Sequence, residues 1–463
     1  MFHCRDKELK DLNKRYGKDN FECIVVYGRR RVGKTALINE FCKEKPTVFF
    51  SALSASSQEN LEALSKAIYE KDHPGVETAP VYPSFDAAFH EITRMAEEER
   101  LVFVIDEYPY LVKANKSISS RLQHMIDHTW KNGKLFLILC GSSMSFMEYQ
   151  VLGYESPLYG RRTGQYKIQA LTYKEMTEFN PGLNDEQQAL IYGITGGIPH
   201  YINKLDVDAD VDDALKENLF NTSSYLYEEP ENLLKQELRE PAIYNSVITA
   251  VAGGASHSNE IATKVGIESP ICAKYLKVLL DLGILVKKTP ITEKAGKKTI
   301  YAIGDNFFRF WYHFVPQNTS VISAGRIDRI YDPVIKKHYS DYMGLIFEQM
   351  CREYLFLYAE DVPVVLSDIG SWWGTDSKEK KEIEIDIVGT SVEGKEYVIG
   401  SCKYKNAPVG IDELELLKHY ADVFGKGEKY HYYIFSKGGF TEEIQKLADN
   451  GEVRLVSLQD MYR

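Results

Sequence analysis

One short segment, Gly28 to Thr35, constrains the fold more than any other part of the chain. It reads Gly-Arg-Arg-Arg-Val-Gly-Lys-Thr and lies between an apolar run of strand-forming residues, 23–27, and a helical stretch, 36–41. A glycine-rich turn between a buried strand and a helix N-terminus directs backbone N–H groups inward, where they can surround phosphate oxygens. The segment therefore predicts a phosphate-binding loop (P-loop) in an α/β domain, with an unliganded glycine turn as the alternative.

The residue types at the end of this loop are those that ATP and Mg²⁺ require. We expect Lys34 to reach the β- and γ-phosphates and the Thr35 hydroxyl to coordinate Mg²⁺. The side chains of Arg29, Arg30 and Arg31 are expected on the outer surface of the loop, because a backbone cradle does not need them. The predicted nucleotide-binding residues are Gly28, Arg29, Arg30, Arg31, Val32, Gly33, Lys34, Thr35 and Ala36.

A second apolar segment, 101–105, ends in the adjacent acids Asp106 and Glu107. This is the pattern of a Walker B motif. Asp106 is expected to hold Mg²⁺ through water, and Glu107 to polarise the attacking water. An Asp-Glu pair after a strand is weak on its own, since acids often begin loops, but downstream of a P-loop it strongly indicates an ATPase.

Two further segments offer catalytic candidates. An apolar strand, 135–140, ends in Gly-Ser-Ser, and Ser142 would lie beside the γ-phosphate if this strand neighbours the Walker B strand. Arg161 and Arg162 could stabilise charge on the γ-phosphate as arginine fingers, within one subunit or across two. An ordinary strand-to-loop turn and a solvated basic turn are the respective alternatives.

Length and composition limit the number of domains and the cellular compartment. The 463 residues are too many for one core and predict about three or four compact units. The sequence has no apolar run long enough to span a membrane and no apolar secretory signal. Seven scattered cysteines favour free thiols in a reducing cytosol over a disulfide framework. We therefore expect a cytoplasmic protein with no membrane partner. An oligomer is possible.

The pattern along the chain predicts four domains: an ATPase core (1–165), a helical lid on the nucleotide (166–238), a winged helix-turn-helix (239–315) and a C-terminal α/β unit (316–463). The Gly196-Gly-Ile-Pro199 segment is expected to separate two lid helices. In the third domain, helices at 242–251, 258–265 and 271–282 precede strands at 284–288 and 299–303. Ser269 is expected as N-cap of the last helix, with apolar residues Ile271, Tyr275, Leu276 and Leu279 on one face.

The winged-helix segment reverses the charge balance of a chain whose net charge is −11. Between Ser258 and Ile300 there are eight lysines and four acids. Lys274 and Lys277 on the recognition helix, with Lys294, Lys297 and Lys298 at the wing tip, could contact DNA phosphates. The exposed helix face carries no Arg, Asn or Gln for base reading. An intramolecular latch is therefore an equal alternative to DNA binding.

The last 150 or so residues contain a second arrangement of charged groups. A helix that opens at Gly344 carries Glu348, a strand at 382–388 carries Glu384 and Asp386, and the next strand, 396–404, carries Ser401 and Lys403. This resembles the PD-(D/E)XK nuclease core, in which acids and a lysine bind Mg²⁺ and activate water. Ser401 stands where that motif has an acid, and a hydroxyl is a poor ligand for a hard cation. The pattern therefore favours a degenerate nuclease-like site.

Taken together, these motifs resemble a family of archaeal and bacterial AAA-like P-loop ATPases in the STAND group of switch proteins. The resemblance rests on Phe2, Arg5, Glu8, GRRRVGKT, VIDEY, GSS, GRRT and GGIP, and continues through 303–312 and 371–375 to the Glu-Ile-Asp-Ile stretch. It implies that Arg5 lies near the nucleotide base, and that the last domain is PD-(D/E)XK-like with Glu usual at the position of Ser401.

The predicted architecture is therefore an α/β protein with an AAA-like P-loop NTPase core, a helical lid, a winged helix and a restriction-endonuclease-like C-terminal domain. The expected function is an ATP–Mg²⁺ switch that hydrolyses ATP and engages DNA or a protein partner. An ATP-gated, Mg²⁺-dependent DNA nuclease and a non-cutting DNA-binding regulator are the alternatives.

Overall fold

The computed structural model describes residues 3–205, 207, 210–294, 296 and 298–463. Phe2, which was quoted for the family resemblance, and Lys297, a predicted DNA contact, therefore lie outside the described residues. The chain forms two compact units, the first comprising residues up to Leu171 with Ile198–His200, the second comprising Thr172–Gly197 and Tyr201–Arg463. Within the described part of the chain, no helix combines the length and apolar character needed to cross a membrane.

The first unit is built on a parallel sheet with strand order β2-β3-β4-β1-β5. Its central strands are buried along their whole length, as apolar runs in a sheet covered on both faces must be. The strands are β1 (Glu22–Tyr27), β2 (Thr47–Ser51), β3 (Val102–Asp106), β4 (Phe136–Gly141) and β5 (Gly164–Lys167).

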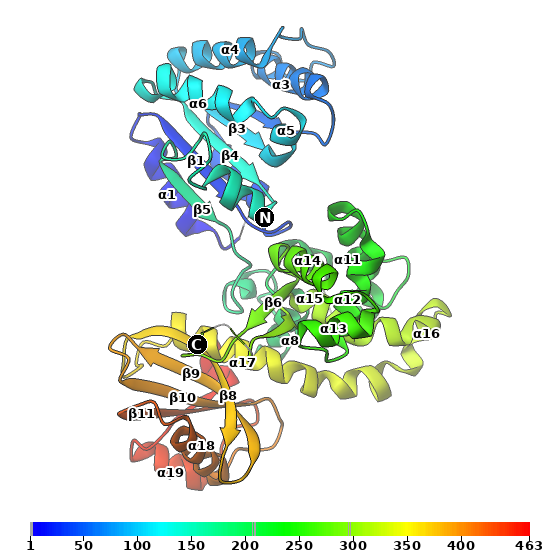
Figure 1. The fold of residues 1–463 in the computed structure, drawn as a ribbon, viewed down its shortest axis with the longest axis vertical. Helices are drawn as coiled ribbons and strands as arrows, with labels where there is room; N and C mark the ends of the chain where they lie inside the picture. Colours follow the sequence, from blue (N-terminus) through cyan, green and yellow to red (C-terminus); the bar gives the residue numbers. More distant parts are fainter. Residues whose placement is uncertain (1–2, 206, 208–209, 295, 297) are drawn as a thin grey trace. The chain divides into compact units, whose positions relative to one another are not determined.

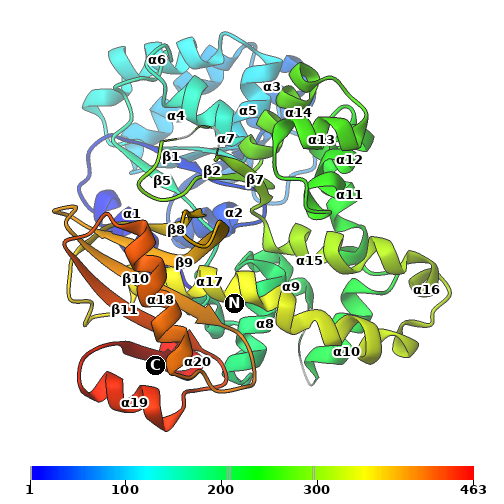
Figure 2. The same ribbon diagram turned by 60° about the horizontal axis from the view of Figure 1, so that its bottom comes forward.

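Helices cover both faces of this sheet, as Figures 1 and 2 show. Leu12 of α1 and Phe41 of α2 are buried on one side, while α3 to α6 pack on the face that carries Val25, Phe103 and Leu137. The helices are α1 (Asp6–Tyr16), α2 (Lys34–Cys42), α3 (Ser57–Asp72), α4 (Phe85–Glu98), α5 (Tyr108–Ala114), α6 (Ile118–His128) and the short α7 (Met144–Phe146).

The second unit begins with helices α8 (Asp185–Thr195), α9 (Pro199–Leu205), α10 (Val211–Leu219) and α11 (Tyr225–Glu237). Gly196 and Gly197 have φ of 61° and 68°, so the Gly-Gly-Ile-Pro segment is a tight left-handed turn between α8 and α9. The aromatic helix α15 (Asn306–Phe314) buries Phe307, Phe308 and Phe310 and packs on α8. The short α16 (Thr319–Ser323) follows it.

Three helices and a two-stranded antiparallel ribbon occupy residues 241–303: α12 (Pro241–Ala252), α13 (Ser258–Val265), α14 (Ser269–Asp281), β6 (Leu285–Lys288) and β7 (Ile300–Ile303). Two details differ from the sequence prediction. Glu268 is the N-cap of α14 and Ser269 is its first helical residue. Ile271 is 41% exposed and faces away from the core, because Cys272, Leu276 and Leu279 form the buried stripe.

The chain ends in a mixed sheet of order β12-β11-β10-β9-β8. Its strands are β8 (Leu366–Asp376), β9 (Lys381–Ser391), β10 (Glu396–Lys403), β11 (Lys429–Ser436) and β12 (Arg454–Ser457). α18 (Ile411–Phe424) crosses β10 and β11 (Figure 2), α17 (Tyr339–Leu357) packs on β8 to β10, and α19 (Glu442–Asp449) and α20 (Leu458–Tyr462) complete the unit. The sequence prediction that Gly344 opens a helix is wrong, since α17 already begins at Tyr339.

Candidate functional site

The loop between β1 and α2 adopts a conformation that its glycines make possible. Gly33 has φ of 92°, a left-handed value that favours glycine. At Gly28, a Cβ atom would lie 2.2 Å from the carbonyl oxygen of Ile168. The loop therefore fits closely against the chain just after β5, with no room for a side chain at its first residue.

The N-terminus of α2 opens onto this loop. The N-cap of α2 is Gly33, which has no side chain to occupy the backbone N–H groups of the first turn, so these groups can bind an anion. Lys34 is only 7% exposed, its Nζ donates to the Arg29 carbonyl at 2.7 Å, and burial lowers its pKa. Lys34 is thus a buried cation at a helix N-terminus, and phosphate oxygens of a triphosphate could replace the Arg29 carbonyl as its partner.

The Walker B strand places its acid directly opposite the P-loop threonine. Thr35 Oγ1 donates to Asp106 Oδ2 at 3.0 Å, and the other oxygen, Oδ1, accepts from Glu107 N at 2.9 Å. Asp106 is buried, at 6% exposure. A hydroxyl and a carboxylate in hydrogen-bond contact can both face one Mg²⁺ ion, since hard cations take oxygen ligands. These two residues fit the predicted metal site.

Strand β4 lies beside β3, the condition under which Ser142 was expected at the site. Ser142 Oγ donates to the two Glu107 carboxylate oxygens at 3.1 and 3.3 Å. Glu107 has a left-handed backbone with φ of 50° at the start of α5, which is costly for a residue other than glycine. The structure therefore brings Glu107 and Ser142 together at the carboxyl edge of the sheet.

Two other groups line the P-loop. Arg5 is buried and donates to the carbonyls of Val32 in the loop and Gln169 after β5, so it links the P-loop to the segment that follows β5. Pro199, from the Gly-Gly-Ile-Pro turn, lies 3.9 Å from the Cβ position of Gly33. Pro199 belongs to the first unit, and no local sequence pattern indicated its contact with the P-loop. Arg29, Arg30 and Arg31 are half-buried, and Arg30 donates to the Tyr110 hydroxyl.

The segment that contains Arg161 and Arg162 lies at the opposite edge of the sheet. Strands β1 and β5 are parallel, with Ile24 opposite Gly164. Residues just before Gly164 are thus at the amino ends of the strands, whereas the P-loop follows their carboxyl ends. A six-residue strand such as β1 separates the two edges by about 16 Å.

Both arginines already have partners at that edge. The Arg161 guanidinium contacts both oxygens of the Asp127 carboxylate, at 2.9 and 2.7 Å, and lowers the pKa of that acid. Arg162 donates to the Leu152 carbonyl at 3.2 Å. The structure therefore does not bring either arginine to the P-loop of its own chain, and a role in a second subunit stays a prediction.

The second unit contains the other predicted charged cluster. Ile383 and Ile385 of β9 face the core under α18, so the alternating residues Glu384 and Asp386 start from the opposite face. On that face, burial and then Asp386 raise the pKa of Glu348 to about 7. Burial also raises the pKa values of Glu384 and Asp386. These three acids, from α17 and β9, therefore share one poorly solvated site.

A fourth acid, Glu413, completes the cluster, and no sequence motif indicated it. Glu413 in the first turn of α18 contacts Lys403 Nζ at 3.0 Å and accepts from Ser401 Oγ at 2.6 Å. Asp386 Oδ2 accepts from Cys402 N at 2.8 Å, where β9 and β10 no longer pair. Glu413 thus places a carboxylate beside Ser401, the position at which the PD-(D/E)XK motif has an acid. Only the packing of α18 over β10 reveals the contact between Glu413 and Lys403, because these residues lie in different elements.

A segment after β6 contacts the same domain. Ile291 is part of the core under the C-terminal sheet, and its N–H donates to the Ser371 carbonyl at 2.9 Å. Lys288, at the end of β6, has a pKa lowered by burial and by neighbouring arginines, partly offset by Glu348 and Glu384. The ribbon and the carboxylate cluster are therefore parts of one packed structure.

The comparisons with known proteins agree with the nucleotide site. Residues 2–205 match the model of an ATPase domain predominantly from Archaea, and residues 311–415 match a model of archaeal and bacterial proteins of unknown function. An uncharacterised protein of Methanocaldococcus jannaschii is 32% identical over 471 residues, covering 99% of this chain and 100% of that protein. An uncharacterised ATP-binding protein of the same archaeon is 44% identical over 45 residues, 10% of this chain and 76% of its own length.

Among solved structures, the chain is similar to the Walker-type ATPase of Pyrococcus abyssi. The TM-score is 0.53 at 19% identity, covering 68% of this chain and 96% of that one. At this level of identity the similarity shows the fold alone, an α/β P-loop NTPase core.

Proposed function

The chain belongs to the family of the Methanocaldococcus jannaschii protein that is 32% identical to it, and we propose that it binds ATP with Mg²⁺ at the P-loop, hydrolyses ATP and uses the cycle as a conformational switch. The observation that carries this proposal is the set of contacts at the carboxyl edge of the first sheet. Thr35 meets Asp106, and Glu107 meets Ser142, around the buried Lys34.

Each of these residues has a role in the proposed reaction. The backbone N–H groups at the start of α2 bind the phosphates, and Lys34 exchanges its Arg29 carbonyl contact for phosphate oxygens. Thr35 and Asp106 would hold Mg²⁺, which neutralises charge on the phosphates. Glu107 orients a water for attack on the γ-phosphorus and accepts its proton, while Ser142 fixes the carboxylate.

Two substitutions test the proposal by steady-state ATP turnover and nucleotide titration of the full chain. Lys34→Ala should weaken ATP binding by about 100-fold, because the phosphates lose a charge-assisted partner. Glu107→Gln should bind ATP normally and hydrolyse it about 100-fold more slowly. Lys43→Ala, an exposed lysine at the end of α2, is the matched control. ATP binding unchanged in Lys34→Ala would refute the proposal.

The second unit is proposed to deliver the output. The helices after residue 172 would act as a lid, and residues 241–303 as a winged helix that engages DNA or a protein partner. Lys274, Lys277 and Lys287 are exposed on this module, and Lys298 pairs with Glu293 at the ribbon tip. ATP turnover measured with and without duplex DNA separates the two outputs, since only DNA engagement predicts stimulation by DNA.

A second candidate function is metal-dependent DNA cleavage by the C-terminal domain. The observation that favours it is Glu413, whose carboxylate lies beside Lys403 and Ser401. Glu413 and Asp386 would hold Mg²⁺, and Lys403 would position the attacking water. Cleavage of plasmid DNA in Mg²⁺ that disappears in both Asp386→Ala and Glu413→Gln supports this function. No cleavage by the unmodified chain, with ATP or without it, excludes it.

A further inference from the structure

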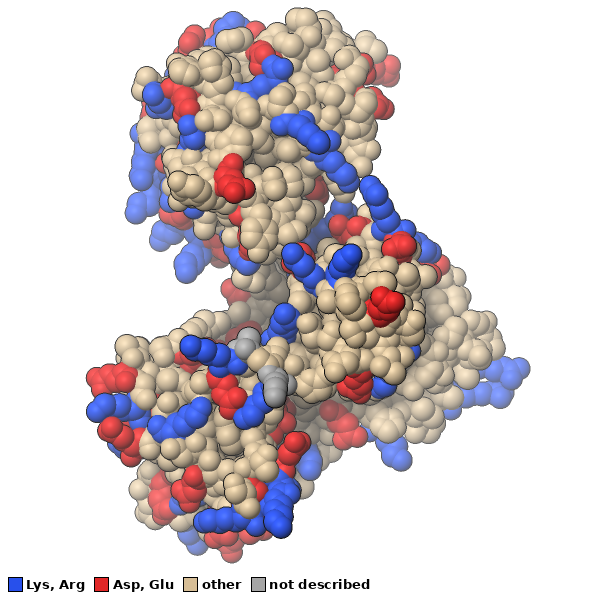
Figure 3. Space-filling view, viewed as in Figure 1, with Lys and Arg blue, Asp and Glu red and all other residues tan. Residues whose placement is uncertain are grey.

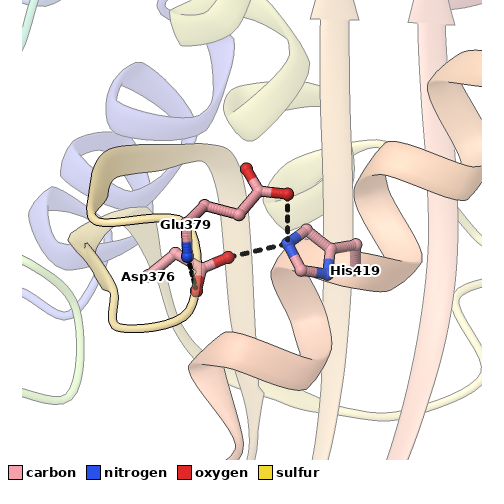
Figure 4. Close-up of side chains that lie close together, drawn as sticks. All are labelled: Asp376, Glu379 and His419. Carbon is pink, nitrogen blue, oxygen red and sulfur yellow. Dashed lines mark hydrogen bonds and ion pairs between the residues drawn. The ribbon is translucent and has the colours of Figure 1, made fainter.

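A separate cluster of possible metal ligands lies at the edge of the C-terminal sheet. Asp376 ends β8, Glu379 follows in the turn to β9, and His419 comes from the second half of α18. Figure 4 shows the three side chains converging from the turn and the helix. They share no residue with the carboxylate cluster around Asp386. Glu413 lies on the same helix, six residues earlier than His419.

The ligand atoms are close enough to bind one ion. One oxygen of Asp376, one of Glu379 and a ring nitrogen of His419 lie within 4.8 Å of one another. His419 Nε2 is 2.8 Å from Asp376 Oδ2 and 3.9 Å from Glu379 Oε1. Tetrahedral metal–ligand bonds of about 2.1 Å place neighbouring ligand atoms roughly 3.4 Å apart. The His419–Asp376 pair would therefore open by roughly 0.6 Å, and Glu379 would close on His419 by roughly 0.5 Å.

The two carboxylates differ in a way that suits a metal site. Asp376 is 1% exposed, and its Oδ1 accepts from Lys378 N at 2.8 Å and Glu379 N at 3.2 Å. These backbone donors fix the carboxylate with Oδ2 directed toward His419, as outer contacts orient a metal ligand. Glu379 has a side chain that is 56% exposed, so it is free to close on an ion from solvent.

The ligand types select the ion. Imidazole nitrogen suits zinc and other first-row transition metals, whereas Mg²⁺ and Ca²⁺ prefer oxygen donors alone. Three protein ligands leave a fourth position for water. Figure 3 shows acidic and basic side chains interspersed over the visible face of this domain.

We propose that Asp376, Glu379 and His419 bind a divalent transition-metal cation, with Zn²⁺ as the fitting example. The ion links the β8–β9 turn to α18, the helix whose first turn carries Glu413. The inference stands independently of ATP hydrolysis and of DNA cleavage, because neither uses these three residues.

Zn²⁺ binding to the full chain tests the proposal by calorimetric titration in the presence of excess Mg²⁺, which occupies oxygen-only sites. His419→Ala should weaken one Zn²⁺ site by about 100-fold, and the exposed Glu379→Gln by about tenfold. Bound Co²⁺ gives a second readout, because its visible absorption changes when a nitrogen ligand is lost. Circular dichroism confirms that Glu379→Gln folds.

His431→Ala is the matched control, since His431 Nε2 also lies 2.7 Å from a carboxylate oxygen, that of Glu396. It should leave the Zn²⁺ titration and the Co²⁺ spectrum unchanged. Identical Zn²⁺ affinity in the unmodified chain, Glu379→Gln and His419→Ala would overturn the proposal. So would Zn²⁺ binding that is lost equally in His431→Ala.

Discussion

Gly28 shows how a single residue fixes the position of the phosphate-binding loop. Its missing Cβ is what allows the loop to approach the Ile168 backbone, where the contact would be 2.2 Å. The partner is a backbone carbonyl rather than a flexible side chain, so neither backbone segment can move aside without a large cost in free energy.

We therefore expect Gly28→Ala to destabilise the ATPase unit by about 3 kcal/mol and to weaken ATP binding as the loop moves away. Urea unfolding followed by tryptophan fluorescence measures the first effect. Gly17→Ala is the control, because Gly17 has φ of −67° and its nearest contact is an ordinary 3.6 Å. Equal stability of Gly28→Ala and Gly17→Ala would contradict this account of the loop.

Substitution of Ser142 tests whether its hydroxyl aligns Glu107, the proposed base. Its hydroxyl is 3.1 Å from Glu107 Oε2, so Ser142→Ala frees the carboxylate to rotate. Turnover should fall about tenfold or more, with ATP affinity unchanged, because water positioning affects the transition state more than binding. Ser143→Ala, one residue along, is the control for the loop. A drop in affinity with unchanged kcat would instead place Ser142 among the phosphate-binding groups.

At the scale of elements, α17 ties the start of the second unit to its C-terminal sheet. Glu353 of α17 accepts from Tyr173 N at 2.9 Å and from the Tyr192 hydroxyl at 3.3 Å. Burial raises the pKa of Glu353 to about 7, and these hydrogen bonds only partly oppose the shift. The carboxyl is thus protonated when folded at a pH where the unfolded chain has lost the proton.

The sign of the pH dependence follows from that difference. Between pH 4.5 and about 7 the folded state binds more protons than the unfolded state, so the free energy of unfolding falls as pH rises. The loss through Glu353 is up to about 3 kcal/mol. Glu353→Gln should flatten the stability curve over this window, whereas exposed Glu360→Gln should not. Parallel curves for all three proteins, measured by urea unfolding, would rule out this role.

The elements also show what sequence patterns can and cannot predict. Helix α13 and strands β6 and β7 lie within a residue of their predicted bounds, because apolar spacing and turn residues encode them locally. The Thr35–Asp106 contact followed from motif chemistry. The partnership of Glu413 with Lys403 and the approach of Pro199 to Gly33 depend on tertiary packing between separate elements, and no local pattern encodes them. The same holds for Arg161, whose ion pair with Asp127 is invisible in the sequence.

For the whole molecule, charge decides which partners the proposed switch can engage. A net charge of −11 repels nucleic acid on average, so any DNA binding must come from a local cluster. Lys274 and Lys277 are exposed on α14, while Tyr275 between them contacts Glu240 at 2.8 Å and fixes the helix on its neighbour. Such a lysine pair contacts phosphates without reading bases.

If these lysines bind DNA, affinity should be insensitive to sequence and should fall steeply with salt. Replacing both, in Lys274→Gln with Lys277→Gln, removes about two phosphate contacts and should reduce the slope of log affinity against log salt by about 1.8. Fluorescence anisotropy with labelled duplex DNA measures the slope. Lys43→Gln with Lys66→Gln is the charge-matched control, because these lysines, at the end of α2 and within α3, have side chains that are 68% and 45% exposed. An unchanged slope in the α14 variant would direct the output of the ATPase to a protein partner instead.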